Sequence, residues 1–530
     1  MRKIFFLALL CFGLNLYSSD YYPLDPGTDI IRYIFNLHLT DSNDVIDGEA
    51  LINMVHRAKT GIVTFDLTGR NLAGKGMTVA QVLVDKRVAE WNHENNRLKI
   101  VLPVSKDEGS FTNIEIKYRG IPADGLIISE NRHGNRTFFA DNWPDRARNW
   151  IPCVDHPSDK AKVEFKVYAP EKYTVVSNGL RVEESYIDDG IKLTHWKEEV
   201  SIPTKVMVIG VARFASQLLD RVGGTDIWTY VFPEDREIGF SDFSAAIDPF
   251  TFFSDRIGSY PYEKLANVQS KTIFGGMENA GCIFYSERTV SGNKRAESLM
   301  AHEIAHQWFG NSVTEGDWHH VWLSEGFATY FTSLYFEFKD GPDKLRSSMA
   351  SSRTRVIRAI DRRPAPVIDT TITNFMELLS TYSYQKGAWV LHMLRNEMGD
   401  EHFNTAIRTY YSRFRNRNAL TSDLRSTMEE FSQKDLETFF DQWLYRPDIP
   451  VLDIDWDYSA RKKELTLNIR QVQEGEVFYF PLTVSFGNEG KTIREEIQIN
   501  QKLSTFTIKL EDRPDKVIPD PDVKLLFREF

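Results

Sequence analysis

The chain has 530 residues, enough for three or four domains of ordinary size. Hydrophobic residues make up 42% of it and charged residues 26%, which is typical of globular proteins and excludes disordered, collagen-like and coiled-coil classes. The net charge is −11, and the sequence contains no long basic stripe. Because an acidic surface repels phosphate backbones, these features argue against a nucleic-acid-binding protein.

The first residues have the pattern of a secretory signal segment. Arg2 and Lys3 precede an apolar run over residues 4–14, and small residues follow it. This run is shorter than the roughly 20 apolar residues that a membrane-spanning helix needs. We therefore predict a signal peptide over residues 1–19 and export to the periplasm or the extracellular space; the alternative is a segment retained as an N-terminal anchor. No later stretch of the sequence is apolar enough to span a membrane.

Only two cysteines, Cys153 and Cys282, follow the signal segment. An oxidising compartment would permit one disulfide, but the two positions fall in different predicted domains. We therefore expect two buried free thiols.

Residues 20–214 are predicted to form a β domain. Polar and apolar residues alternate in Tyr33–Leu39 and again in Val163–Tyr168, and Asp124-Gly125 is a typical turn sequence. The expected structure is a large antiparallel domain with its hydrophobic face turned inward.

The pattern becomes helical between Ser241 and Leu444. Apolar residues recur at helical spacing within Phe243–Ile257, although Pro249 weakens the prediction of this first helix. Long amphipathic stretches follow it. We assign this mostly helical domain to residues 215–446.

Near the end of the helical region, Thr421 or Ser422 with Asp423 is typical of a helix N-cap. The prolines within residues 446–450 then end the helices. A small β-sandwich is predicted over residues 447–530, because β alternation returns in two stretches, Leu465–Ile469 and Phe480–Phe486.

The strongest chemical signal is the run His302–His306, with the sequence HEIAH. Two histidines four positions apart lie on one face of a helix, so both rings can reach a single metal ion. Glu303 between them would lie where it can deprotonate a metal-bound water. Residues 296–307 contain no Gly or Pro, as expected of a helix. The alternative is a core helix whose histidines are only hydrogen-bonded.

A hydrolytic zinc site has three protein ligands and one water, so a third ligand is needed. Glu325 is the candidate, nineteen positions after His306 in the apolar segment Trp322–Tyr330. This separation leaves room for a turn and a second helix packed against the first. A carboxylate in such surroundings is costly unless a charge compensates it, and a zinc ion would do so.

Four motifs together resemble the zinc aminopeptidases of the aminopeptidase N and leukotriene-hydrolase type, the gluzincin metallo-exopeptidases. They are Gly275–Asn279 (GGMEN), His306–Asn311 (HQWFGN), Trp322–Ala328 (WLSEGFA) and Ser383–Ala388 (SYQKGA). The order of β, helical and β regions is also similar to that family's first three domains. The resemblance implies a multidomain α+β fold with an N-terminal antiparallel β domain, a thermolysin-like, mostly helical catalytic domain and a small C-terminal β-sandwich.

The resemblance also implies a function, that of a zinc-dependent aminopeptidase with one zinc ion per chain. The expected zinc ligands are His302, His306 and Glu325. Glu303 would be the general base, and Tyr384 would stabilise the oxyanion that forms when water attacks the peptide carbonyl.

A substrate-binding segment is implied over Gly275, Gly276, Met277, Glu278 and Asn279. Glu278 would bind the free ammonium group of the substrate. The two glycines would let the backbone approach a peptide and hydrogen-bond it like an added strand. The expected partners are therefore peptides with a free N-terminus.

Trp143 departs from the family pattern. It stands where the family usually has a second acidic or amide residue for the substrate's ammonium group, in a segment that precedes Pro152-Cys153. Amine binding would then depend on Glu278 alone, or would use Asp141 or Asn142.

Two further departures lie near the third ligand. Ser324 replaces the Asn that commonly precedes it, and His319 and His320 stand where the family mostly has Trp or acidic residues. We expect these two histidines to be exposed loop residues.

Three other functions are alternatives to the aminopeptidase. A thermolysin-type endopeptidase shares the zinc ligands, but Glu278 would find no ammonium group in the middle of a peptide. A non-catalytic scaffold would be expected to lose the ligands, and all of them are present. No residue indicates a lipid epoxide-hydrolase activity.

Overall fold

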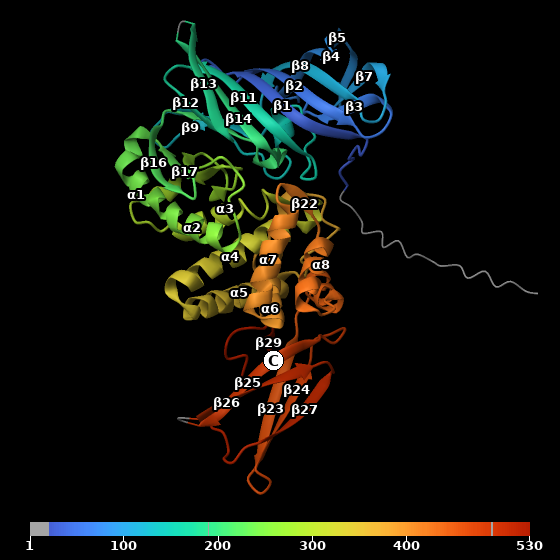
Figure 1. The fold of residues 1–530 in the computed structure, drawn as a ribbon, viewed down its shortest axis with the longest axis vertical. Helices are drawn as coiled ribbons and strands as arrows, with labels where there is room; N and C mark the ends of the chain where they lie inside the picture. Colours follow the sequence, from blue (N-terminus) through green and yellow to red (C-terminus); the bar gives the residue numbers. More distant parts are fainter. Residues whose placement is uncertain (1–20, 189, 489–490) are drawn as a thin grey trace, which may run out of the picture.

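The computed structural model describes residues 21–188, 190–488 and 491–530. The predicted signal peptide over residues 1–19 lies outside these described residues. Three regions follow one another along the long axis: a β-rich N-terminal region, a helical middle and a β-rich C-terminal region (Figure 1). Among the described residues, no helix is both long and apolar enough to cross a membrane.

An eight-stranded sheet is the main layer of the N-terminal region. Its strands, in spatial order, are β13 (Leu180–Asp188), β14 (Ile191–Pro203), β11 (Lys160–Pro170), β1 (Thr28–His38), β2 (Ile46–His56), β8 (Phe111–Ile121), β4 (Gly76–Val84) and β5 (Arg87–Val88). The two stretches predicted from alternation lie in β1 and β11 and are direct neighbours, with Tyr33 opposite Val163. They pair in parallel, whereas the other neighbouring pairs of this sheet are antiparallel. The prediction of an antiparallel domain was wrong for this pair, because alternation reveals the buried face and not the strand direction.

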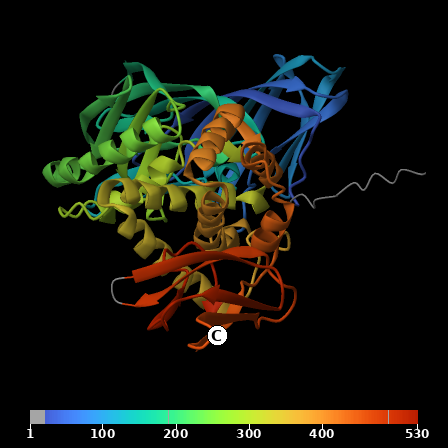
Figure 2. The same cartoon turned by 60° about the horizontal axis from the view of Figure 1, so that its bottom comes forward.

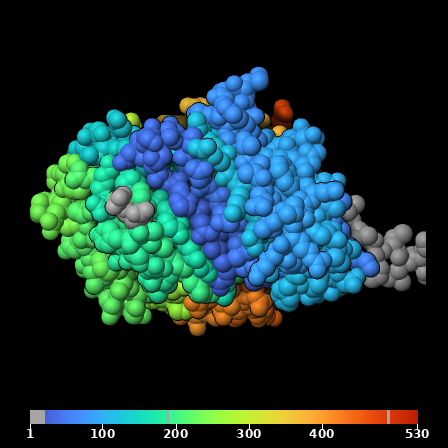
Figure 3. Space-filling view, turned by 90° about the horizontal axis from the view of Figure 1, so that it is seen from above, coloured from blue at the N-terminus to red at the C-terminus, as the bar shows by residue number. Residues whose placement is uncertain are grey.

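Two smaller sheets complete this region. One contains β12 (Thr174–Ser177), β15 (Ile209–Ala212), β10 (Arg136–Ala140) and β9 (Leu126–Glu130), and the other β3 (Thr60–Asp66), β7 (Arg97–Lys106) and β6 (Glu90–Glu94). Seen from above, the N-terminal region covers this end of the molecule, and the helical region is visible only at its edges (Figure 3).

The middle region begins with a five-stranded sheet. Its order is β16 (Ala215–Val222), β17 (Thr225–Val231), β18 (Lys264–Ser270), β20 (Cys282–Ser286) and β19 (Gly276–Met277), so that β19 is an edge strand. The sequence pattern did not predict this sheet. Every residue of β18 is buried, and a fully buried strand shows no alternation.

Helices make up the rest of the middle region. They are α1 (Arg236–Phe243), α2 (Ile247–Arg256), α3 (Glu297–Ala305), α4 (Trp322–Asp340), α5 (Pro342–Arg362), α6 (Gly387–Met398), α7 (Asp400–Phe414), α8 (Thr421–Ser432) and α9 (Glu437–Phe440), with a small sheet of β21 (Val313–Glu315) and β22 (Arg417–Ala419) among them. Pro249 is the third residue of α2, where a missing backbone N–H breaks no helical bond.

The N-cap of α8 differs from the prediction. Leu420 is the N-cap, and its backbone N–H donates to the Asp423 carboxylate at 2.7 Å. Thr421 is already the first helical residue, and its hydroxyl accepts a hydrogen bond from the Trp322 indole at 2.9 Å. The predicted cap was therefore too late in the sequence, because the Thr421 hydroxyl is used by a residue distant in the sequence.

The C-terminal region is the predicted β-sandwich. One sheet contains β27 (Leu503–Lys509), β24 (Glu464–Gln471), β23 (Val451–Ser459) and β29 (Arg528–Glu529), and the other β26 (Lys491–Ile499), β25 (Phe480–Asn488) and β28 (Lys516–Pro519). Figure 2 shows this layer against the lower end of the helices. The domain boundaries predicted at residues 214 and 446 stay predictions.

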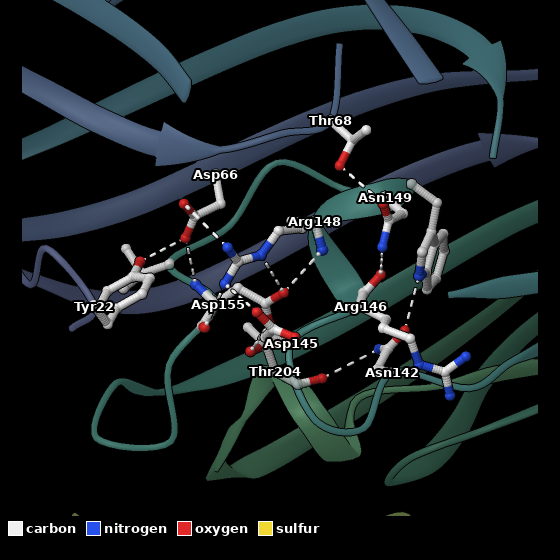
Figure 4. A network of polar contacts seen from close by, with 12 residues as sticks. Tyr22, Asp66, Thr68, Asn142, Asp145, Arg146, Arg148, Asn149, Asp155 and Thr204 are labelled. Atoms are coloured by element: carbon white, nitrogen blue, oxygen red, sulfur yellow. Dashed lines mark hydrogen bonds and ion pairs between the residues drawn. The ribbon is translucent and has the colours of Figure 1, made fainter. Parts of the chain in front are cut away.

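A polar network fixes the loop that leads from β10 to β11 (Figure 4). Arg148 contacts Asp155 at 3.1 Å and Asp145 at 3.3 Å, and Asp155 also accepts a hydrogen bond from the Thr204 hydroxyl at 2.7 Å. Cys153 lies in the same loop; it and Cys282 are both buried and free, as predicted. The same loop carries Trp143, which is 2% exposed.

Candidate active site

The predicted metal-binding helix forms as α3, but it is shorter than expected. It ends at Ala305, and His306 is its C-cap. The chain then turns through Gly310, which has a φ of 115°. A Cβ at Gly310 would lie 2.1 Å from the Ser324 hydroxyl, so this glycine leaves room for the start of α4 to approach His306.

Three potential ligand atoms converge between α3 and α4. The Nε2 atoms of His302 and His306 lie 3.2 Å apart, and each is 3.3 Å from Glu325 Oε2. All three side chains are mostly buried, with exposed fractions of 18%, 1% and 5%. Among the described residues, they form a group of His, Cys, Asp or Glu side chains that could hold one metal ion.

The ring of His306 is oriented by its other nitrogen. Nδ1 lies 3.2 Å from the Phe309 carbonyl oxygen and 3.0 Å from the Ser324 hydroxyl. A proton on Nδ1 can be donated to that carbonyl, which leaves the lone pair of Nε2 directed at the cluster. Ser324, a departure from the family pattern, thus contacts the back of a predicted ligand.

The cluster is strongly acidic. Three carboxylates, those of Glu278, Glu303 and Glu325, share one cavity with the two histidines, and no described residue that lines it is Lys or Arg. Burial, with the other two carboxylates, raises the pKa of Glu303 well above its usual value. Burial would also raise the pKa of Glu325, but the facing His306 and His302 rings hold it below its usual value. A bound cation would compensate this buried negative charge.

Glu303 lies against the edge strand β19. A Cβ built on Gly276 would lie 2.4 Å from Glu303 Oε1, whereas one on Gly275 would meet only Leu299, at 3.8 Å. The two glycines of the GGMEN motif therefore have different roles. Gly276 makes room for the Glu303 carboxylate, and Gly275 leaves the edge of the cavity open.

Glu278 follows β19 and is 5% exposed. Its backbone carbonyl accepts hydrogen bonds from the side-chain amides of Gln307 at 2.7 Å and Asn311 at 2.6 Å. Its Oε1 atom has no hydrogen-bond partner in the part of the chain that the structure describes. The residues after the metal helix thus fix the backbone of Glu278, while its carboxylate stays available to a ligand.

Tyr384 lies in a π-helical turn over Tyr382–Lys386, and its ring stacks on that of His302 with centroids 5.8 Å apart. Burial, with the nearby carboxylates, raises the pKa of Tyr384 well above its usual value, so the phenol keeps its proton. In the same turn, the buried Lys386 donates to the carbonyls of Arg446 at 2.7 Å and Asp448 at 3.3 Å.

Two glycines bring this turn beside Glu325. A Cβ on Gly326 would lie 3.0 Å from the backbone of Gly387, and one on Gly387 would lie 3.2 Å from Gly326 Cα. Helices α4 and α6 therefore meet backbone to backbone, at the glycine that follows Glu325 and at the one that begins α6. This contact explains the glycines of the WLSEGFA and SYQKGA motifs.

These residues enclose a cavity of about 220 Å³. Trp143 forms one wall and is 2% exposed; its indole meets Phe274 and Trp318 edge to face. Met277 also lines the cavity, whereas Asn279 is buried outside it. The structure thus brings together every predicted site residue except Asn279.

Comparison with known families identifies the fold. Residues 29–206 match the Peptidase M1 N-terminal domain, and residues 242–443 match the Peptidase family M1 domain. The chain belongs to peptidase family M1. The two matches account for the N-terminal β region and the helical region that together build the cavity.

The M1 chain is similar to several aminopeptidases. It is 30% identical over 345 residues to glutamyl aminopeptidase of Bos taurus, covering 62% of this chain and 36% of that one. It is 27% identical over 394 residues to probable aminopeptidase 2 of Sulfurisphaera tokodaii, covering 71% and 48%. The chain thus spans between a third and a half of the length of these relatives.

A solved structure shows the same fold. A mutant of an M1 zinc metallopeptidase from Deinococcus radiodurans superposes with a TM-score of 0.68 at 23% identity. The match covers 80% of this chain and 96% of that one.

Within the M1 chain, Asp141 and Asn142 do not reach the cavity. Asp141 pairs with Arg146 at 2.6 Å and accepts a hydrogen bond from the Thr272 hydroxyl at 2.9 Å. Asn142 donates to the Met207 carbonyl at 2.6 Å and belongs to the network of Figure 4. The prediction that either could help Glu278 is therefore wrong, because both are used to fix the loop that holds Trp143.

The two histidines before α4 are not exposed. His319 is 1% exposed and contacts the Ile372 carbonyl at 3.1 Å, and His320 contacts the Thr421 hydroxyl at 2.8 Å. The prediction of exposed loop residues is wrong, because the segment after α5 covers His319 and the first residue of α8 contacts His320.

Sequence reasoning missed the roles of Gln307 and Asn311. Both lie within the HQWFGN motif, whose sequence alone does not indicate what their side chains contact. Two amides within five residues after a predicted metal ligand, His306, are a signal for a structural role, since amides can support a neighbouring backbone carbonyl. Their target, Glu278, lies about 30 residues earlier in the chain and could not be inferred from spacing.

Proposed function

We propose that this chain is a zinc-dependent aminopeptidase that removes the N-terminal residue of peptides. One observation carries the proposal. The Glu278 carboxylate, buried and with a free oxygen, shares one small cavity with the cluster of His302, His306 and Glu325. The roles proposed below for Glu303 and Tyr384 complete the reaction.

The donor set fits zinc. Two imidazoles and one carboxylate are the ligands of many hydrolytic zinc sites, and the cavity has an excess of buried negative charge. We propose one zinc ion per chain, held by His302, His306 and Glu325. Such an ion supplies Lewis-acid polarisation of a carbonyl and lowers the pKa of water.

Glu303 is proposed as the general base. Its buried carboxylate has a raised pKa, so it can accept a proton from the attacking water and hold it. It would then pass that proton to the nitrogen of the leaving amine. Gly276 leaves the space in which this carboxylate lies.

Tyr384 is proposed to stabilise the oxyanion. Its phenol stays protonated and lines the cavity beside His302, so its O–H can donate to the negative oxygen that forms on the substrate carbonyl.

Glu278 is proposed to select the N-terminus. A free ammonium group would pair with its unpartnered oxygen, and Trp143 would close that side of the cavity. A peptide held in this way presents only its first peptide bond to the cluster. An internal peptide segment has no ammonium group, so the Glu278 carboxylate would stay unpaired beside it. This disfavours an endopeptidase.

The proposal is tested with matched peptides that have a free or an acetylated N-terminus. We expect hydrolysis of the free peptide only and loss of activity with a chelator. We also expect kcat/KM to be roughly 10- to 200-fold lower in Glu278→Gln, because a charge-assisted hydrogen bond contributes about 1.5–3 kcal/mol. Efficient cleavage of acetylated peptides at internal bonds, equal in both proteins, would contradict the exopeptidase assignment. A metal-loaded protein that hydrolyses no peptide would favour the scaffold alternative.

Export stays a proposal that rests on residues 1–19. Mass spectrometry of the protein isolated from its native host would detect a new N-terminus close to residue 20 if the signal segment is removed. An intact Met1 in a cytoplasmic fraction would contradict it.

A further inference from the structure

A large hollow of about 890 Å³ adjoins the candidate active site, and neither the metal chemistry nor the ammonium site uses it. It shares Phe274, Gly275 and Leu299 with the smaller cavity, so the two lie side by side. We propose that this hollow binds a carboxylate group of the substrate, carried by the third or a later residue. The inference rests on the proposed aminopeptidase function.

The direction of the bound peptide follows from the edge strand. One edge of β19 pairs antiparallel with β20, and β19 is the last strand of its sheet. A peptide whose ammonium group lies at Glu278 and which adds to the free edge must run back from Glu278 toward Gly275. Each extended residue advances about 3.3 Å, so the third and later residues pass Gly275 and enter the hollow.

The hollow is cationic although the whole chain has a net charge of −11. Lys271, Arg288 and Arg295 line it, and Glu287 is its acidic lining residue. Lys271 and Glu287 pair with each other at 2.8 Å. Arg288 and Arg295 form no ion pair with any described residue, which leaves two guanidinium groups for a ligand.

The segment that carries these arginines is held in place. The Asp242 carboxylate accepts hydrogen bonds from the backbone N–H groups of Ser291, Gly292 and Lys294, at 2.7, 2.8 and 3.0 Å. On its other side, Arg132 donates to the carbonyl oxygens of Glu287 and Val290. The backbone positions of both arginines are therefore fixed before substrate binds, which lowers the ordering cost of binding.

Two sources can supply the carboxylate. An acidic side chain at the third or fourth position is one, and the free C-terminus of a short peptide is the other. Planar guanidinium groups bind both through the same paired hydrogen bonds.

The experiment compares tetrapeptides with alanine at the first two positions. One pair carries Asp or Asn at the third position with an amidated C-terminus, and a second pair is tetra-alanine with a free or an amidated C-terminus. We expect kcat/KM to be roughly threefold to tenfold higher for the carboxylate member of at least one pair, the range expected for partly exposed ion pairs.

The double variant Arg288→Gln/Arg295→Gln should abolish this preference and leave hydrolysis of amidated tetra-alanine unchanged. The double variant Arg461→Gln/Lys462→Gln, which removes the same two positive charges from an exposed turn of the C-terminal sandwich, is the matched control and should keep the preference. Arg355 lines a different cavity, beside His302 and Tyr384, and Arg355→Gln should also keep it.

Several outcomes would overturn the inference. These are equal rates for all four peptides, a preference that survives the double variant, and a preference lost in Arg355→Gln instead. Failure to hydrolyse any of the peptides would overturn the proposed function and this inference together, whereas loss of the charge preference alone would overturn only the carboxylate site.

Discussion

Gly276 and Glu303 are neighbours in space because Gly276 has no side chain. A Cβ on Gly276 would lie 2.4 Å from Oε1 and 2.5 Å from Cδ of Glu303. The backbone of edge strand β19 and a carboxylate from helix α3 thus occupy adjoining space, and any larger residue at position 276 must displace the carboxylate.

We predict that Gly276→Ala lowers kcat/KM by roughly 100-fold, since displacement of a reacting group by about 1 Å has an effect of this size. Its metal content should be normal. Gly275→Ala is the control, because its Cβ would make only an ordinary contact with Leu299 at 3.8 Å. Steady-state kinetics and metal analysis of both variants check the prediction; equal losses would refute it.

Metal binding is the second prediction. The purified chain should contain about one zinc ion, and His306→Ala should lose most of it, because this ring is oriented through both of its nitrogens. Elemental analysis after dialysis measures the content. An active protein without any transition metal would eliminate the zinc proposal.

The variant Glu303→Gln tests whether Glu303 is the general base and not a metal ligand. The amide cannot accept the proton, so turnover should fall by roughly 10²- to 10⁴-fold while zinc is retained. Glu325→Gln makes the same chemical change at a predicted ligand and should instead lower the zinc content. If both variants lost zinc to the same extent, Glu303 would have to be counted among the ligands.

Tyr384→Phe removes one hydroxyl from the stacked pair with His302. We expect kcat to fall by at least tenfold with a much smaller change in KM, because the hydroxyl acts mainly on the oxyanion of the transition state. A rise in KM at constant kcat would show that the phenol binds substrate in the ground state.

Much of the site could be predicted from local sequence, because its chemistry lies in short segments. His302 and His306 are related by one helical turn, and their convergence needs no tertiary information. Glu325 could be proposed because one acidic residue stands in an apolar segment. The approach of Tyr384 depends on the contact between Gly326 and Gly387. A glycine in the sequence indicates that another group approaches closely, but it does not identify that group.

The fold was predictable where strands are exposed on one face, as in β1 and β24. The fold could not be predicted where a strand is completely buried, as in β18. It also could not be predicted where a polar residue is buried against a residue distant in the sequence. Asp141 and His319 illustrate the second case. Each is polar and would be assigned to the surface or to a ligand, yet each is buried by partners more than 50 residues away in sequence.

Lys386 connects two parts of the molecule that have been described separately. Its ammonium group holds the carbonyls of Arg446 and Asp448, at the point where the chain leaves the helices for the C-terminal sandwich. Tyr384 is two residues away in the same turn. One buried side chain therefore ties the turn that bears Tyr384 to the start of the C-terminal region, although none of that region's described residues lines the cavity.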